Sequence, residues 1–169
     1  MSRTDTLTWA PGAGDREPVL PWPTILGWIL GAGLVLLTIR DRRAGRGGPR
    51  RWLDGSLFGV VGIAGLILAF LVFVSLHSVT NGNLNLMWAI PTHVIPAVAL
   101  LAGRDPRWLR PYMLVTFALA ALFLLGLPFW PQEIPAAVIP FVIGIAVRAA
   151  ALAFPPSTSE SQASDGSSR

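Results

Sequence analysis

The two histidines of this sequence, His77 and His93, flank a polar stretch that joins two strongly apolar segments. An imidazole can act as a general base, and it is also a common metal ligand. Between the histidines lie all three asparagines of the chain, Asn81, Asn83 and Asn85, and the stretch has no charged residue. An unpaired polar group next to hydrocarbon is costly. We therefore expect these side chains to find partners, either within the stretch or in a ligand.

The asparagines stand at alternate positions, and this spacing has two interpretations. In an extended segment the three amides share one side, and Leu84 and Leu86 face the membrane. Such a segment can present amide donors and acceptors to a lipid headgroup. In the other interpretation the amides cap helix ends and satisfy the backbone of the loop. The sequence leaves both open.

His93 falls within the third apolar segment, next to Pro91. An ionisable side chain inside a membrane helix is a functional hypothesis by default. The alternative is a neutral histidine bonded to a carbonyl that a proline has freed. His77 and His93 could also ligate haem or a metal, but the sequence has no third histidine and no cysteine. We therefore expect neither a metal site nor a cofactor.

The composition is that of an integral membrane protein. Of 169 residues, 53% are hydrophobic and only 13% are charged, the mean hydropathy is +0.58, and apolar runs of membrane length recur. The absence of cysteine excludes disulfides, thiolate metal sites and cysteine nucleophiles. All 13 basic residues are arginines that lie mostly between the apolar runs. We interpret them as topology signals, and we expect no nucleic-acid partner.

The apolar runs predict an all-α bundle of five transmembrane helices. We place the helices at about 24–39, 54–76, 86–102, 111–127 and 134–154, so that the membrane module covers 24–154. Pro91 and Pro96 break the third segment. Residues 1–23 are expected to form a flexible tail without a cleavable signal peptide, and residues 155–169 a disordered tail.

Small and charged residues suggest how the helices pack. Gly27 and Gly31 form a GxxxG pair, which allows close helix approach but is also common by chance. A second group falls on one stripe of the second helix and predicts a packing face: Gly55, Gly59, Gly62 and Ala69. Asp54 begins that helix, where it favours the helix dipole or pairs with an arginine. Arg148 lies near the end of the fifth helix, and we expect it to snorkel to the interface.

The arginines also predict the orientation in the membrane. The loop at 40–52 has six arginines and the loop at 103–110 has three, whereas the loops at 77–85 and 128–133 have none. Positive charge favours the cytoplasmic side. We therefore expect the N-terminus outside, the C-terminus in the cytoplasm and the histidine-flanked stretch facing outward, with Asn83 outside and Gly47 inside.

One pattern in the sequence resembles a known family. It runs Asp54-x-x-Leu57-Phe58, Gly62, Gly65, His77, Asn83-x-Asn85-Leu86-x-Trp88 and Pro91, and it is similar to the five-helix membrane module of the lipoprotein N-acyltransferase Lnb family. Members carry an outward-facing, papain-like thiol domain before five membrane helices, and they move an acyl chain from the lipid part of a lipoprotein to its N-terminal amine. No thiol domain or cysteine is found in this sequence, so the family's catalytic residues cannot be placed.

What the resemblance implies is a membrane module that holds lipid or lipoprotein beside an outward-facing partner. The leading hypothesis is thus a non-catalytic module of the bacterial inner membrane that binds lipid or lipoprotein, or docks a separate outward-facing catalytic protein. Its candidate binding residues are His77, Asn83, Asn85, Trp88, Pro91 and His93, of which His93 rests on the residue argument alone. The alternatives are a membrane enzyme that acts on a lipid acyl or head group through His77 or His93, and a purely structural subunit.

Overall fold

The computed structural model describes residues 21–46, 48–74 and 83–155, and this part of the chain is helical without any strand. Its elements are α1 (Trp22–Arg43), α2 (Arg51–Phe73), the short 3₁₀ helices η2 (Leu84–Met87) and η3 (Pro91–His93), α3 (Val94–Leu101), α4 (Leu109–Leu125) and α5 (Val138–Ala153). The prediction of an all-α chain with five helices is confirmed. His77, residues 1–20 and residues 156–169 lie outside the described residues, and so do the predictions made for them.

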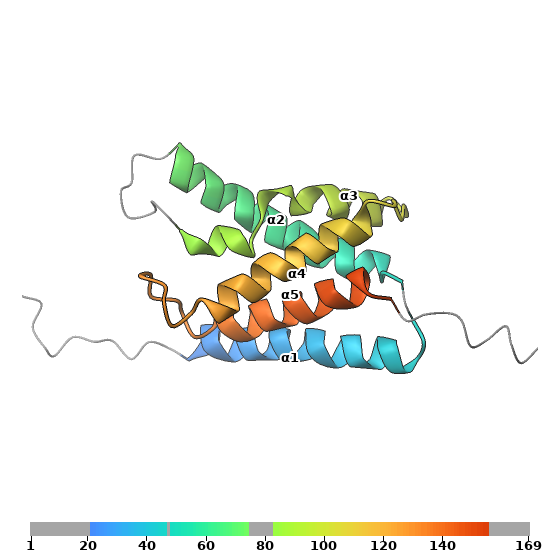
Figure 1. Cartoon of the computed structure of the whole chain (residues 1–169), viewed down its shortest axis with the longest axis horizontal. Coiled ribbons are helices and arrows are strands. Elements are labelled where there is room, and N and C mark those ends of the chain that lie inside the picture. Colours follow the sequence, from blue (N-terminus) through green and yellow to red (C-terminus); the bar gives the residue numbers. More distant parts are fainter. Residues whose placement is uncertain (1–20, 47, 75–82, 156–169) are drawn as a thin grey trace, which may run out of the picture.

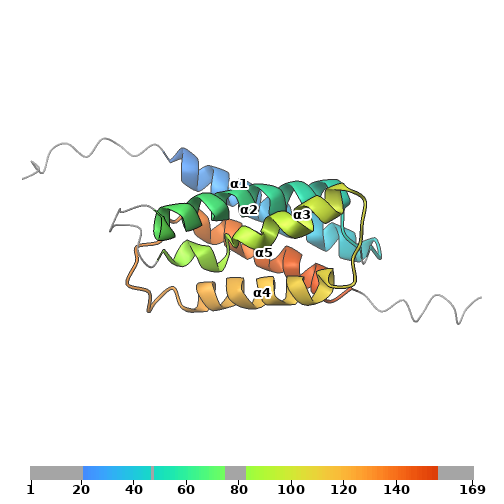
Figure 2. The same cartoon turned by 90° about the horizontal axis from the view of Figure 1, so that it is seen from above.

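The helices run alongside one another as a bundle with two distinct ends (Figures 1 and 2). α5 packs between α1 and α4, while α2 packs against α3 and the segment before it. At one end α1 ends, α2 begins, and α3 turns into α4. We call this the arginine-rich end, because both arginine-containing loops lie there. The opposite end, with η2 and the connection between α4 and α5, is called the amide end. α1 begins at the amide end and α5 ends at the arginine-rich end (Figure 1).

The lengths and surfaces of the helices suit a membrane. α1, α2 and the interrupted segment Leu84–Leu101 are each long and apolar enough to cross one. α4 and α5 have 17 and 16 residues, or about 24–26 Å at 1.5 Å per residue, slightly short of a hydrocarbon core of about 30 Å. Many large apolar side chains on the outer faces are exposed, among them Ile29, Val60 and Phe70. In water such a surface would be unstable, whereas lipid tails cover it without cost.

The third apolar segment is interrupted at Pro91, as predicted, but Pro96 does not break it, because it lies in the first turn of α3, where its missing N–H has no helical partner to lose. The first part of the segment is not extended. Asn83 accepts a hydrogen bond from the backbone N–H of Asn85 and so starts the 3₁₀ turn η2. The extended interpretation is therefore wrong for residues 84–87, while Asn81 lies outside the described residues. Leu84 is half-buried and packs against a core cluster formed by α4 and α5 instead of facing the membrane. The α-helix begins only at Val94.

The glycine patterns mark close helix contacts. A Cβ atom at Gly27 or Gly31 would overlap the backbone of α5 or the residue before it, so the GxxxG pair of α1 is a packing site. On α2, a Cβ at Gly62 or Gly65 would likewise meet backbone of the third segment. Gly59 differs, because its Cβ would lie 3.6 Å from the nearest side-chain atom, which is an ordinary contact. The predicted stripe does face another segment, but its middle glycine is not the tight position.

Candidate functional site

Asn83, Asn85 and Trp88 form one hydrogen-bonded unit at the amide end. Asn83 Oδ1 accepts from the backbone N–H of Asn85 at 3.0 Å and from Asn85 Nδ2 at 2.9 Å. Asn85 Oδ1 in turn accepts from the indole Nε1 of Trp88 at 3.0 Å. The Trp88 ring then meets Phe141 of α5 edge to face, with 5.9 Å between ring centroids. Asn83 thus caps η2, and Asn85 holds the Trp88 ring in place. This agrees with the second interpretation of their spacing, in which the amides satisfy the loop itself.

Gln132 joins this unit from the connection between α4 and α5. Its Oε1 accepts from the backbone N–H of Leu84 at 2.9 Å. Two side-chain amino groups remain, Asn83 Nδ2 and Gln132 Nε2, and neither has a hydrogen-bond partner among the described residues. Both residues are half-buried, and no buried side-chain nitrogen or oxygen in the described ranges lacks a partner. Within the described residues, the amide end therefore offers these two amino groups as candidate donors to a ligand. The sequence does not predict that Gln132 belongs to this unit, because only the fold brings it beside Leu84.

His93 is fully buried, and both of its ring nitrogens are in use. Nε2 lies 3.2 Å from the carbonyl oxygen of Trp88, which can only accept, so Nε2 carries the proton. In the neutral ring Nδ1 then accepts from the hydroxyl of Tyr112 at 2.7 Å, and Thr92 Oγ1 lies 3.0 Å from that hydroxyl. The ring packs against Phe58 at 5.3 Å between centroids. This is the geometry of a neutral histidine bonded to a backbone carbonyl, with no free lone pair.

The structure divides the candidate residues into two groups, which meet where His93 Nε2 bonds to the backbone carbonyl of Trp88. Asn83, Asn85 and Trp88 are joined at the amide end. His93 instead contacts Tyr112 in the first turn of α4, which begins at the arginine-rich end (Figure 1). Pro91 starts η3 and is half-buried. Within the described ranges, no group of three His, Asp or Glu side chains is placed to hold a metal ion.

A buried cluster of charges lies at the arginine-rich end and joins three helices. Arg148 of α5 donates to both carboxylate oxygens of Asp54, from Nε at 2.6 Å and from Nη2 at 2.7 Å, and to Asp41 at 2.9 Å. Its side chain is only 2% exposed. The prediction that Arg148 snorkels to the interface is therefore wrong, because two carboxylates from α1 and α2 meet it inside the bundle. Asp54 does pair with an arginine, although from a distant part of the chain.

Arg50 closes this cluster from the start of α2. Its guanidinium binds both oxygens of Asp41, and its backbone N–H donates to Asp54 at 2.7 Å. Hydrogen bonding to Asp41 raises the pKa of the Arg50 guanidinium above its ordinary value. Two carboxylates thus face two guanidinium groups, and the net charge of the cluster is zero. Such a pairing holds α1, α2 and α5 in register. A signal was present in the sequence, since Asp41 and Asp54 flank one basic loop.

Comparison with known proteins supports the similarity that the motif residues suggested. A family model described as the Lnb transmembrane domain matches residues 15–156. Comparisons with curated proteins and with solved structures gave no match. The matched range covers all five helices, both ends of the bundle and the buried charge cluster. It extends well beyond the motif that first carried the resemblance. This chain therefore belongs to the Lnb transmembrane domain family.

Proposed function

We propose that this protein is a multi-pass module of the bacterial inner membrane whose amide end binds the carbonyl-bearing part of a lipid or lipoprotein. The observation that carries the proposal is a pair of amide donors on half-buried residues, Asn83 Nδ2 and Gln132 Nε2, for which the described residues supply no partner. Ester and amide carbonyls of a lipid can only accept hydrogen bonds, so they complement these donors. Trp88, locked beside them, offers an aromatic ring of the kind found at headgroup depth.

The charge at the amide end favours an uncharged group as the part of the ligand that binds there. Glu133 follows Gln132 and is exposed, and no described arginine accompanies it there. A carboxylate disfavours an isolated phosphate, so we propose uncharged carbonyl groups as the acceptors. A separate outward-facing catalytic protein would then act on the lipid held at this end. The module itself is proposed to be non-catalytic, because the ring nitrogens of His93 already have partners.

The proposed orientation can be tested by labelling, because the natural chain has no cysteine. We expect Asn83→Cys to react with a membrane-impermeant thiol reagent from outside intact spheroplasts. Gly48→Cys, in the loop between α1 and α2, should react only after lysis. Both positions belong to the described part of the chain, and neither lies within α1 or α2. Outside labelling of position 48 with protection of position 83 would reverse the proposed topology.

The proposed binding can be tested with substitutions that remove donors and keep the fold. Asn83→Asp and Gln132→Glu retain the oxygens that accept from Asn85 and Leu84, but they lose the NH₂ groups. We expect the double variant to co-purify with several-fold less lipid or lipoprotein per mole of protein, as measured by mass spectrometry. Its melting temperature should stay close to that of the parent chain.

The matched control for this experiment is Asn85→Ala. That change removes the side-chain bonds of Asn85 to Asn83 and Trp88 but keeps the Asn83 cap, which uses the backbone N–H of residue 85. It should lower the free energy of unfolding by about 1 kcal/mol, and the melting temperature should fall accordingly. If the double variant retains as much lipid as the parent chain, the amino groups of Asn83 and Gln132 are not a binding site. If it loses stability as Asn85→Ala does, these amides are structural.

A further inference from the structure

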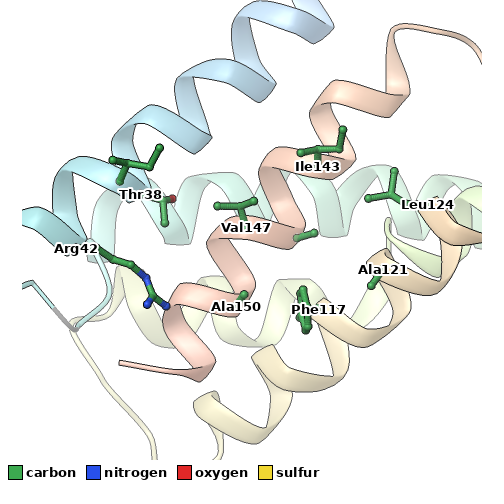
Figure 3. A pocket seen from close by; sticks show the side chains of 10 residues that line it. Thr38, Arg42, Phe117, Ala121, Leu124, Ile143, Val147 and Ala150 are labelled. Atoms are coloured by element: carbon green, nitrogen blue, oxygen red, sulfur yellow. The ribbon is translucent and has the colours of Figure 1, made fainter. Parts of the chain in front are cut away.

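A second surface, remote from the amide end, has the chemistry of a lipid site. A groove of about 400 Å³ lies between α1, α4 and α5, which is within the range of ligand sites in proteins. We call it the α5 groove, and Figure 3 shows the side chains that line it. They include Thr38, Arg42, Phe117, Ala121, Ile143 and Ala150. Only Thr38 and Arg42 are polar, and the Thr38 hydroxyl already donates to Leu34 O at 2.7 Å.

Arg42 supplies the one charge of the α5 groove. It belongs to the last turn of α1, and in Figure 3 its guanidinium lies close to Ala150 at one end of the groove. One of its five N–H donors bonds to the carbonyl oxygen of Phe154 at 3.0 Å. The others have no partner among the described residues. The neighbouring carboxylate of Asp41 is taken up by Arg50 and Arg148, so an exposed cation faces an apolar groove.

The length of the α5 groove along the helix fits within one leaflet of the membrane. Its lining residues on α5 run from Ile143 to Ala150, which is about 10 Å of helix. Half of a bilayer's hydrocarbon core is about 15 Å. Arg42 stands at the arginine-rich end, where α1 leaves its apolar stretch. A lipid whose phosphate binds Arg42 would therefore extend one acyl chain along the groove without leaving its own leaflet.

We propose that the α5 groove binds an anionic phospholipid of the leaflet on the arginine-rich side. Its phosphate oxygens accept hydrogen bonds from Arg42, and one acyl chain lies against α4 and α5. Charge complementarity selects this occupant, because several arginines of the adjacent loop face the same interface and basic sites between helices favour anionic headgroups. The site is independent of the amide end, so either proposal can fail without the other.

The headgroup part of this proposal is tested with a matched pair of arginines. The full chain is delipidated in detergent and titrated with phosphatidylglycerol or phosphatidylcholine, and native mass spectrometry counts the bound lipids. Arg42→Gln should weaken phosphatidylglycerol binding about tenfold, since it removes a charged hydrogen bond. Arg43→Gln removes the same charge from the same exposed turn but lies outside the groove lining, and it should bind like the parent. Equal losses in both variants would overturn the proposal in favour of diffuse charge attraction.

The acyl-chain part is tested by filling the groove. Ala121→Phe should reduce the binding of both lipids, because Ala121 lines the groove. Ala118→Phe adds the same ring on an exposed part of α4 outside it and should change neither. Unchanged phosphatidylglycerol binding in Ala121→Phe would overturn the proposal. If Arg42→Gln unfolds because it loses the bond to Phe154, the same titration is made with Arg42→Lys, which keeps the positive charge. Lost phosphatidylglycerol preference in that variant would also count against the proposal.

Discussion

Replacing Arg148 by methionine is expected to lower the free energy of unfolding by about 3–5 kcal/mol, because removing one partner of a buried ion pair leaves uncompensated charge. Arg148 makes two bonds to Asp54 and one to Asp41, and all three side chains are 3% exposed or less. Without the guanidinium, two carboxylates would remain inside the bundle, balanced only by Arg50 and the largely exposed Arg46 among the described residues. The measurement is thermal or chemical unfolding of the purified chain in detergent or bicelles.

Two further variants make this result specific to the buried cluster. Arg46 lies 3.7 Å from Asp41 with 60% of its side chain exposed, so Arg46→Met should cost no more than about 1 kcal/mol. Adding Asp54→Asn to Arg148→Met removes the carboxylate charge that lost its partner. The asparagine still has an oxygen that can accept from the backbone N–H of Arg50. The double variant should therefore recover part of the lost stability. Equal melting of Arg148→Met and Arg46→Met would show that the cluster is not what holds α1, α2 and α5 together.

Replacing Gly31 by alanine is expected to destabilise the bundle by about 3 kcal/mol, at the upper end of the usual cost of overpacking. The added Cβ would overlap the carbonyl of Pro140 and press on the backbone nitrogen of Phe141. These are backbone atoms of α5 and cannot rotate away as a side chain can. α1 packs mainly against α5, so separating the two helices would loosen the main contact of α1. The readout is the same unfolding measurement.

Gly33 provides the control on the same helix. A Cβ at Gly33 would have no neighbour within 4 Å, so Gly33→Ala should leave stability unchanged or raise it by about 0.5–1 kcal/mol, as alanine is the better helix former. If Gly31→Ala and Gly33→Ala melt alike, α1 does not pack on α5 through this glycine. On α2 the same comparison distinguishes two glycines, because an added Cβ would overlap the carbonyl of Ala89 at Gly65 but would make an ordinary contact at Gly59.

Several features of this protein follow from its sequence alone. Five apolar runs separated by polar or charged loops allow only helices in lipid, since each backbone polar group must be satisfied within its own segment. Pro91 falls at the interruption of the third run, where a residue without a backbone donor is tolerated, whereas Pro96 lies in the first turn of α3 and does not break that helix. The motif from Asp54 to Pro91 pointed to the family that the comparison later showed. These are local or periodic properties, and they do not depend on which helices become neighbours.

Only the tertiary structure decided how the polar side chains are paired. Arg148 and Asp54 are 94 residues apart, and Gln132 is 48 residues from Leu84, so no spacing rule relates them. Because α5 packs against α1 and lies near the start of α2, an arginine expected at the interface became a buried ion-pair partner. Tyr112 reaches His93 for the same reason, and the histidine is held toward α4 instead of among the asparagines. Helix periodicity predicts which face of a helix is buried, whereas the choice of partner depends on how the helices assemble.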